Sequence, residues 1–249
     1  MKIKAITFDF WDTLAIDDSD EAKRSALGLP TKAEARLEAL RREVQTHHPE
    51  FVNGRIAEAF QLANETFRNV QHEESRTLTV AERLGVAYKG LGIPLTPGFS
   101  ALVREIEEME IATQPDFVPG VRETLPILAE RYRLGIISDT IHTPGRLLRD
   151  LLAGRGLLNH FSHWVFSDEA GSAKPARKVF ELAAAGLGAE IGEIVHVGDR
   201  ERTDVAGAQQ AGAKAILFTG AIDRGSAQTK AEAFCEMFSD LPGILERLV

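Results

Sequence analysis

Polar side chains that could do chemistry occur at four places in this sequence, each near the end of a short apolar run. They are Asp9, Ser138, Lys174 and the acidic pair Asp199 and Asp204. Carboxylate oxygens are the ligands that Mg²⁺ prefers, an aspartate can also act as a nucleophile, and a lysine can neutralise an anion. Together with a hydroxyl, these groups can stabilise charge on a transferring phosphoryl group. Taken alone, Asp9 fits equally well an acid that caps a turn or a helix.

The elements that must position these residues alternate between strands and helices. An apolar run beginning at Ile3 predicts a buried strand that ends at Asp9. Further strands are expected at 134–138, 164–166, 194–197 and 215–218, and helices at 121–131, 146–152, 175–185 (with Pro175 at its first position), 204–210 and 241–248. This alternation predicts an α/β fold, a Rossmann-like parallel sheet with helices on both faces. Ligands bind at the carboxyl edge of such a sheet, so we expect the four places to meet there.

Residues 15–114 have a different pattern, in which only helical signals occur. Two capping boxes predict helix starts, and they are Thr31 with Glu34 and Thr79 with Glu82. Further helices are expected over about 54–74 and from about Pro97. Such a segment is too long for a loop between two strands. We therefore expect a discontinuous core of residues 1–14 and 115–249, and an inserted all-helical cap domain of residues 15–114.

The composition restricts the partners of the chain. Its 249 residues include 29 basic and 37 acidic side chains, which gives a formal net charge of −8. An acidic chain without a basic run argues against nucleic acid and membrane partners, whereas a lysine and a magnesium ion can still attract a small anionic substrate. The one cysteine, Cys235, is expected to be a packing residue. We find no signal peptide and no membrane span, and we expect a cytoplasmic monomer or homodimer.

Four motifs carry a resemblance to a known family. They are FDFWDTL at 8–14, IISD at 136–139, SAKP at 172–175 and VGDRERTDVAGAQQAG at 197–212. In this order and approximate spacing they are similar to the motifs of haloacid dehalogenase (HAD) superfamily hydrolases with an inserted helical cap. The resemblance implies a covalent aspartyl intermediate, a Mg²⁺ cofactor and a small phosphorylated substrate that enters between cap and core.

The resemblance also implies roles for individual residues. Asp9 resembles the nucleophile, and Lys174 resembles the lysine that balances its charge. Thr13 and Ser138 resemble the groups that position the nucleophile and bind the anion. The substrate or anion site is expected to comprise Ser138, Asp139, Lys174 and Trp11. The Mg²⁺ ligands are expected to be Asp9, Asp199, Asp204 and the carbonyl group of Trp11.

One position departs from the pattern of the family. Its phosphatases usually read D-x-D-G-T, and the second Asp is the general acid/base; here that position is Trp11, and Asp12 takes the place of the glycine. Tryptophan cannot exchange the needed proton, and positioned acid–base catalysis contributes about a hundred- to ten-thousand-fold. The first interpretation is a Mg²⁺-dependent phosphatase of a small phosphorylated metabolite that uses Asp12, His142 or water instead. A solvated loop histidine is the simpler interpretation of His142.

Two other interpretations stay open. A metal-independent 2-haloacid dehalogenase fits Trp11, because relatives of that kind carry an aromatic residue there and halide needs no proton. The intact metal motif argues against it. Its carboxylate-binding cap arginine could be Arg24, Arg41 or Arg55, although an exposed helix surface is the simpler interpretation of each. The third interpretation is a non-catalytic binding protein of the same fold. Separately, His196 is expected to be a core histidine that pairs with the backbone.

Overall fold

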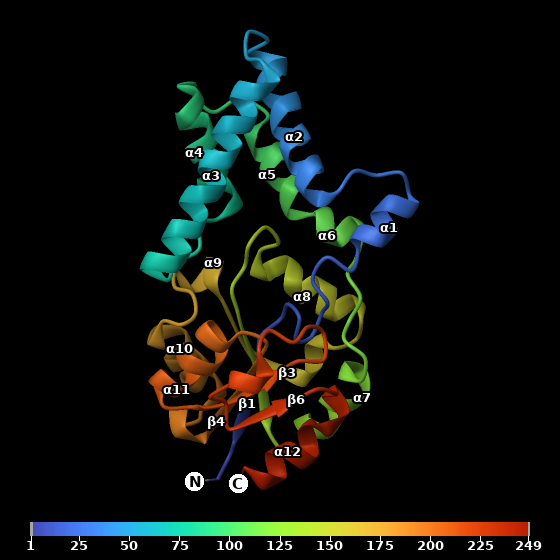
Figure 1. Ribbon diagram of the computed structural model, residues 1–249, viewed down its shortest axis with the longest axis vertical. Helices are drawn as coiled ribbons and strands as arrows, with labels where there is room; N and C mark the ends of the chain where they lie inside the picture. Colours follow the sequence, from blue (N-terminus) through green and yellow to red (C-terminus); the bar gives the residue numbers. More distant parts are fainter. Residues whose placement is uncertain (1, 249) are drawn as a thin grey trace.

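The computed structural model describes residues 2–248, and a six-stranded parallel sheet forms its centre (Figure 1). The strand order is β3-β2-β1-β4-β5-β6, and every adjacent pair is parallel. The strands are β1 (Ala5–Phe8), β2 (Arg133–Ser138), β3 (Phe161–Phe166), β4 (Ile194–Gly198), β5 (Lys214–Phe218) and β6 (Ala233–Cys235). The expected α/β fold is confirmed. The three-residue edge strand β6 was not expected.

The register of the central strands brings their carboxyl ends together. Phe8 pairs with Ile136 on β2 and with Val197 on β4. Asp9 therefore follows β1 at the level where β2 ends in Ser138 and β4 ends just before Asp199. This is the edge of a parallel sheet at which ligands bind.

Helices cover both faces of the sheet because side chains along each strand alternate between two apolar clusters. On β1, Ile6 and Phe8 pack in one cluster and Ala5 in the other. The first cluster takes up α7 (Val121–Ala129), α8 (Gly145–Gly154) and α12 (Leu241–Arg247). The second takes up α10 (Arg177–Leu187) and α11 (Ala206–Ala211). A short helix α9 (Ser167–Ala170) follows β3.

Six helices between β1 and β2 form the part of the molecule that we call the cap. They are α1 (Glu21–Ala26), α2 (Lys32–His47), α3 (Asn53–Glu74), α4 (Val80–Leu91), α5 (Phe99–Glu107) and α6 (Met109–Ala112). Both expected capping boxes are present, with Thr31 opening α2 and Thr79 opening α4. The cap has its own apolar cluster and lies at the end of the molecule remote from both termini (Figure 1). Its extent as an independent domain stays a prediction.

Polar contacts join the cap to the core. The Thr77 hydroxyl lies 2.7 Å from that of Ser167, and Arg202 donates to the carbonyl group of His72 at 3.1 Å. These contacts hold the cap over the carboxyl edge of the sheet. Within residues 2–248, no helix is both long and apolar enough to cross a membrane.

Two expected helix starts are wrong. Helix α10 begins at Arg177, so Pro175 lies before the helix rather than at its first position. The helix expected from Asp204 is preceded by a π-helical turn at Glu201–Val205, and regular α-helix begins at Ala206. The π turn places Asp204 so that its carboxylate accepts from the amide of Arg200, at 2.9 Å.

Candidate active site

A buried lysine links two of the expected site aspartates. The Lys174 Nζ lies 2.8 Å from Oδ1 of Asp9 and 2.6 Å from Oδ1 of Asp204. The Asp9 amide donates to the Val197 carbonyl at 2.9 Å, which ties the loop after β1 to β4. Burial by itself would lower the pKa of Lys174, but the neighbouring carboxylates outweigh it and hold that pKa above its ordinary value. Lys174 is therefore a fixed positive charge between two aspartates.

Three further donors hold Asp204: Nε2 of His196, at 3.1 Å from Oδ1, and the Arg200 amide and Thr203 hydroxyl, at 2.9 and 3.4 Å from Oδ2. Nδ1 of His196 lies 2.9 Å from the hydroxyl of Thr7. Burial lowers the pKa of His196, so the ring is neutral, and it donates to Asp204 and accepts from Thr7. The pKa of Asp204 is lowered because Lys174 and His196 outweigh the opposing effect of burial. His196 is a core histidine, but its partners are side chains, so the expected backbone pairing is wrong.

Three carboxylates converge at the end of β1 and β4. One ligand oxygen each of Asp9, Asp199 and Asp204 lies within 4.8 Å of the others. Oδ1 of Asp199 is buried and has no hydrogen-bond partner within the described residues. Burial, together with the charges of Asp9 and Asp204, raises the pKa of Asp199 to about 7. An all-oxygen donor set with an orphaned acceptor fits Mg²⁺. The carbonyl group of Trp11 as a further ligand stays a prediction.

Arg224 is a site residue that the sequence did not reveal. It lies in the irregular segment after β5, and its Nη1 donates to Oδ2 of Asp199 while its Nη2 donates to Oδ2 of Asp12 at 2.9 Å. The other oxygen of Asp12 accepts from the amide of Asp17 at 3.0 Å. Both oxygens of Asp12 are thus engaged, and its carboxylate braces a loop instead of facing a substrate. No periodicity or motif marks Arg224.

Two buried hydroxyls are free to donate. Oγ1 of Thr13 and Oγ of Ser138 have no hydrogen-bond partner among residues 2–248. Because buried polar groups are normally satisfied, such donors fit a bound anion. The carboxylate of Asp139 instead accepts from the Lys174 amide at 2.9 Å, which positions the lysine's backbone. Burial raises the pKa of Asp139 to about 7.

Trp11 forms a wall of a cavity between core and cap. The cavity has a volume of about 190 Å³ and is lined by Trp11, Asp17, Asp18, Arg36, Glu110, Ile141, His142 and Thr143. The Trp11 ring packs edge-on against Phe10 with a centroid distance of 4.9 Å. His142 is half-buried, and burial together with the charges of Arg36 and Arg83 keeps its pKa well below its ordinary value. The expectation of a solvated His142 is therefore wrong.

The cap arginine at this cavity is Arg36, which sequence reasoning missed. Of the three expected candidates, Arg24 is buried and donates to the carbonyl group of Pro30, whereas Arg41 and Arg55 pair with glutamates of their own helices. None of these three arginines lines the 190 Å³ cavity that Trp11 walls. Arg36 lies one turn into α2, and only the docking of that helix shows which of its faces meets the core.

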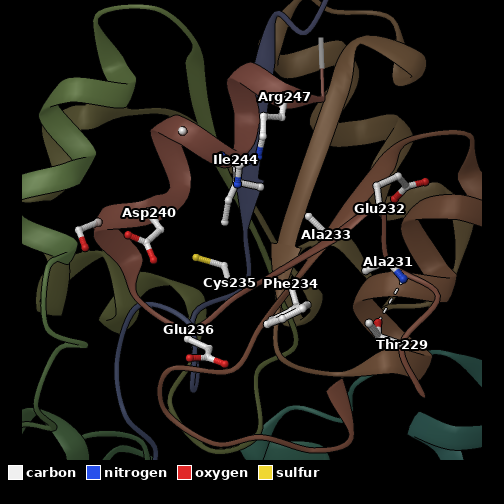
Figure 2. A pocket seen from close by; sticks show the side chains of 12 residues that line it. Thr229, Ala231, Glu232, Ala233, Phe234, Cys235, Glu236, Asp240, Ile244 and Arg247 are labelled. Carbon is white, nitrogen blue, oxygen red and sulfur yellow. Dashed lines mark hydrogen bonds between the residues drawn. The ribbon is translucent and has the colours of Figure 1, made fainter. Parts of the chain in front are cut away.

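A larger hollow lies elsewhere and carries no comparable chemistry. It has a volume of about 840 Å³ and lies between β6 and α12 (Figure 2). Cys235 faces it, but burial raises the pKa of this thiol to about 12, and its Sγ donates to the Met237 carbonyl. The thiol is therefore protonated at neutral pH, and the acidic cluster at the carboxyl edge remains the candidate site.

Comparisons with known proteins agree with this location. The family model described as haloacid dehalogenase-like hydrolase matches residues 3–212. A glyceraldehyde 3-phosphate phosphatase from Pyrococcus abyssi is 30% identical over 87% of this chain and 81% of its own length. A phosphoserine phosphatase from Thermus thermophilus is 38% identical over 46% of this chain and 45% of its own. The solved 2-haloacid dehalogenase from Pseudomonas syringae superimposes with a TM-score of 0.68 at 25% identity, covering 99% of this chain and 100% of its own.

Proposed function

The chain belongs to the haloacid dehalogenase-like hydrolase family, and from that premise we propose that it is a Mg²⁺-dependent phosphatase of a small phosphorylated metabolite. The observation that carries the proposal is the convergence of Asp9, Asp199 and Asp204, with one buried carboxylate oxygen left without a partner. When bound there, a divalent cation would neutralise phosphoryl oxygens. The phosphatases among the relatives support the same choice.

Asp9 is the nucleophile in this proposal. Lys174 holds its Oδ1, and within residues 2–248 no hydrogen bond engages its Oδ2. The Oδ2 atom attacks phosphorus as the bond from phosphorus to the leaving oxygen breaks, which gives an aspartyl phosphate. Thr13 and Ser138 donate their free hydroxyls to phosphoryl oxygens. Water then attacks phosphorus, the bond to Asp9 breaks, and phosphate leaves.

The leaving oxygen needs a proton that Trp11 cannot supply, and Asp17 provides it in this proposal. Asp17 lines the cavity that Trp11 walls, whereas both oxygens of Asp12 are engaged by Arg224 and a backbone amide. Burial raises the pKa of Asp17 to about 6, and the charges of Asp18, Glu110 and Asp12 outweigh that of Lys32. An acid that titrates near the working pH is suited to general acid catalysis.

The test of the phosphatase is phosphate release from p-nitrophenyl phosphate and a panel of phosphomonoesters, with Mg²⁺ and with EDTA. We expect turnover that needs the metal and falls about a thousandfold or more in Asp9→Asn. Phosphate release that survives both EDTA and Asp9→Asn would rule the mechanism out. For the acid, Asp17→Asn should slow an alkyl phosphate about a hundredfold and p-nitrophenyl phosphate far less, since nitrophenolate leaves unprotonated. Asp150→Asn, which changes an exposed aspartate of α8 outside this cavity, is the control.

A 2-haloacid dehalogenase is the second candidate, and two observations favour it. Trp11, two residues after Asp9, forms an aromatic wall of the cavity between core and cap, and the Pseudomonas syringae dehalogenase shares the whole fold. Halide release from 2-chloropropionate that persists in EDTA, with no phosphate release from any ester, would select this function. Release of phosphate without halide would exclude it.

A further inference from the structure

The loop between α3 and α4 reaches from the cap to the segment of the core that carries Lys174. The amide of Ala173 donates to the carbonyl group of Ser75 in this loop, at 2.6 Å. Ala173 is fully buried and directly precedes Lys174, whose own amide donates to Oδ1 of Asp139 at 2.9 Å. The backbone that enters the lysine is therefore held on one side by the cap and on the other by the core.

Ser75 has an uncommon backbone conformation at this contact. It ends α3 in the left-handed region, with φ 47° and ψ 48°. Glycine is the usual residue where a helix ends in this way, because a side chain strains the backbone there. Strained residues persist where the surrounding structure determines their conformation. The strained residue of this loop is thus the one whose carbonyl group meets the lysine segment.

A side-chain contact docks the same loop close to Ser138. The hydroxyl groups of Thr77 and Ser167 lie 2.7 Å apart, and both residues are buried. The Ser167 hydroxyl also accepts from the amide of Thr140 at 2.9 Å, and Thr140 lies two residues after Ser138. The loop therefore contacts two segments of the candidate site, one that follows Ser138 and one that precedes Lys174.

This loop lies on the side of the cap away from its two connections to the core. The connections pair with each other, since the amide of Ile16 donates to the carbonyl group of Asp116 at 2.8 Å. In Figure 1, α1 and α6 adjoin these connections on the right, whereas the lower end of α3 meets the core on the left, near α9. A rotation of the cap about the connections would separate Ser75 and Thr77 from the core.

We propose that Ser75 and Thr77 are positioning residues, which hold Lys174 in place only while the cap is docked on the core. Ser75 acts through the amide of Ala173, and Thr77 keeps the loop against Ser167. When the cap turns away, the Ala173 amide loses its acceptor, and the peptide unit that leads into Lys174 gains freedom. The inference rests on the proposed function, in which Lys174 holds Oδ1 of Asp9 for the attack.

The first test is amide hydrogen exchange of the substrate-free protein, followed by NMR. Thr77→Val keeps the shape of the side chain and removes its hydroxyl. We expect the protection of the Ala173 and Lys174 amides to fall about fivefold, the value of one neutral hydrogen bond. Thr77→Ser retains the hydroxyl and should restore the protection. Thr66→Val on α3 is the matched control, because the Thr66 hydroxyl donates within its own helix, to the Leu62 carbonyl at 2.8 Å.

Ser75 offers a second pair of variants. Ser75→Gly adopts the left-handed conformation without strain and should keep both amides protected, whereas the β-branched side chain of Ser75→Val disfavours that conformation and should expose both. Thermal unfolding shows whether each variant is folded. Loss of protection at Ala173 alone, or at neither amide, in the folded Thr77→Val and Ser75→Val proteins would overturn the inference.

Turnover of p-nitrophenyl phosphate is measured separately. We expect Thr77→Val to lower kcat about fivefold and to change KM by less than about twofold, because Lys174 acts on the nucleophile and Thr77 does not bind the substrate. An unchanged kcat in a variant whose two amides have lost protection would also overturn the positioning role. A wild-type protein without turnover would reject the phosphatase alone, since the exchange of the two amides still decides whether the cap loop positions Lys174.

Discussion

The carboxyl edge of the core and the facing surface of the cap differ in whether their buried cations have carboxylate partners. At the edge, Lys174 contacts Asp9 and Asp204 at 2.8 and 2.6 Å. In the cap, Arg83 is also buried, at 9% exposed against 3% for Lys174, but it has no carboxylate partner within the described residues. The two regions thus differ in whether the buried cation has carboxylate partners.

The cap does not lack buried ion pairs in general, which makes the unpaired Arg83 more informative. Lys32 is buried at the start of α2 and contacts Asp20 at 2.8 Å and Glu110 at 3.1 Å. Burial would lower the pKa of Lys32, but Glu110 and Asp20 outweigh it and raise that pKa. The same six helices therefore pair one buried cation fully and leave another open. The open one is the one that shares a cavity wall with His142.

The largest loss of stability should come from removing Lys174, the buried cation that has carboxylate partners. Lys174→Met leaves Asp9 and Asp204 buried and uncompensated. We expect the free energy of unfolding to fall by about 3–5 kcal/mol, the range for breaking a buried ion pair. Urea unfolding at pH 7 measures it. Lys178→Met, an exposed lysine at the start of α10, is the control. A loss below about 1 kcal/mol for Lys174→Met would show that the pair is not needed for stability.

The sequence predicts the aspartates at the carboxyl edge better than it predicts the arginines of the site and the cap. Short apolar runs locate the central strands, and the residues that follow them, Asp9 and Asp199, must meet because parallel strands end at one edge. The capping boxes at Thr31 and Thr79 are local signals, and the structure contains both. The prediction that Pro175 occupies the first position of α10 failed because the local sequence does not distinguish a proline inside the first turn from one just before the helix.

The missed residues depend on contacts that no local pattern encodes. Arg224 comes from an irregular segment after β5, and it reaches Asp199 only because that segment folds back over the sheet edge. Arg36 and Arg83 are two of many cap arginines, and only the packing of both α2 and α4 against α3 and α5, and of the cap against the core, brings them to one cavity. The edge strand β6 has three residues, too few for an alternating pattern to stand out.

Asp17 allows a pH-dependent test at the cavity between the two regions. Its pKa is raised from 3.8 to about 6, so the folded protein binds more protons than the unfolded chain between these values. Stability should therefore fall as pH rises from about 4 to 6. Asp17→Asn should be more stable than wild type by about 2 kcal/mol at pH 7, after allowance for partial exposure, and equal to it near pH 3.

Urea unfolding from pH 3 to 7 measures this difference, and Asp150→Asn, at an exposed aspartate of α8, serves as the control. A constant difference between Asp17→Asn and wild type across the range would contradict the raised pKa.

Substitution of Arg224 tests whether its guanidinium competes with a metal ion at the carboxyl edge. Its guanidinium holds Oδ2 of Asp199 and so competes with a divalent cation for the same carboxylate. We expect Arg224→Met to tighten Mg²⁺ binding about tenfold, or about 1.4 kcal/mol, by calorimetry. Arg200→Met is the matched control, because its Nε lies farther from Asp199, at 3.8 Å. Weaker Mg²⁺ binding in Arg224→Met would instead make Arg224 a support of the site.

The smallest effect on stability is expected for Arg83, the buried cation without a carboxylate partner. This result decides whether the two buried cations differ in their contribution to stability. Arg83→Met removes a buried charge that costs desolvation energy, together with its hydrogen bonds to Asn64 and its contact with Phe67. These terms oppose each other, so the free energy of unfolding should change by less than about 1 kcal/mol, against the 3–5 kcal/mol expected for Lys174→Met. Urea unfolding of both variants in the same buffer gives the two values side by side. If Arg83→Met were as damaging as Lys174→Met, the contacts of the guanidinium with Asn64 and Phe67 would be as important to the cap as the ion pairs of Lys174 are to the core.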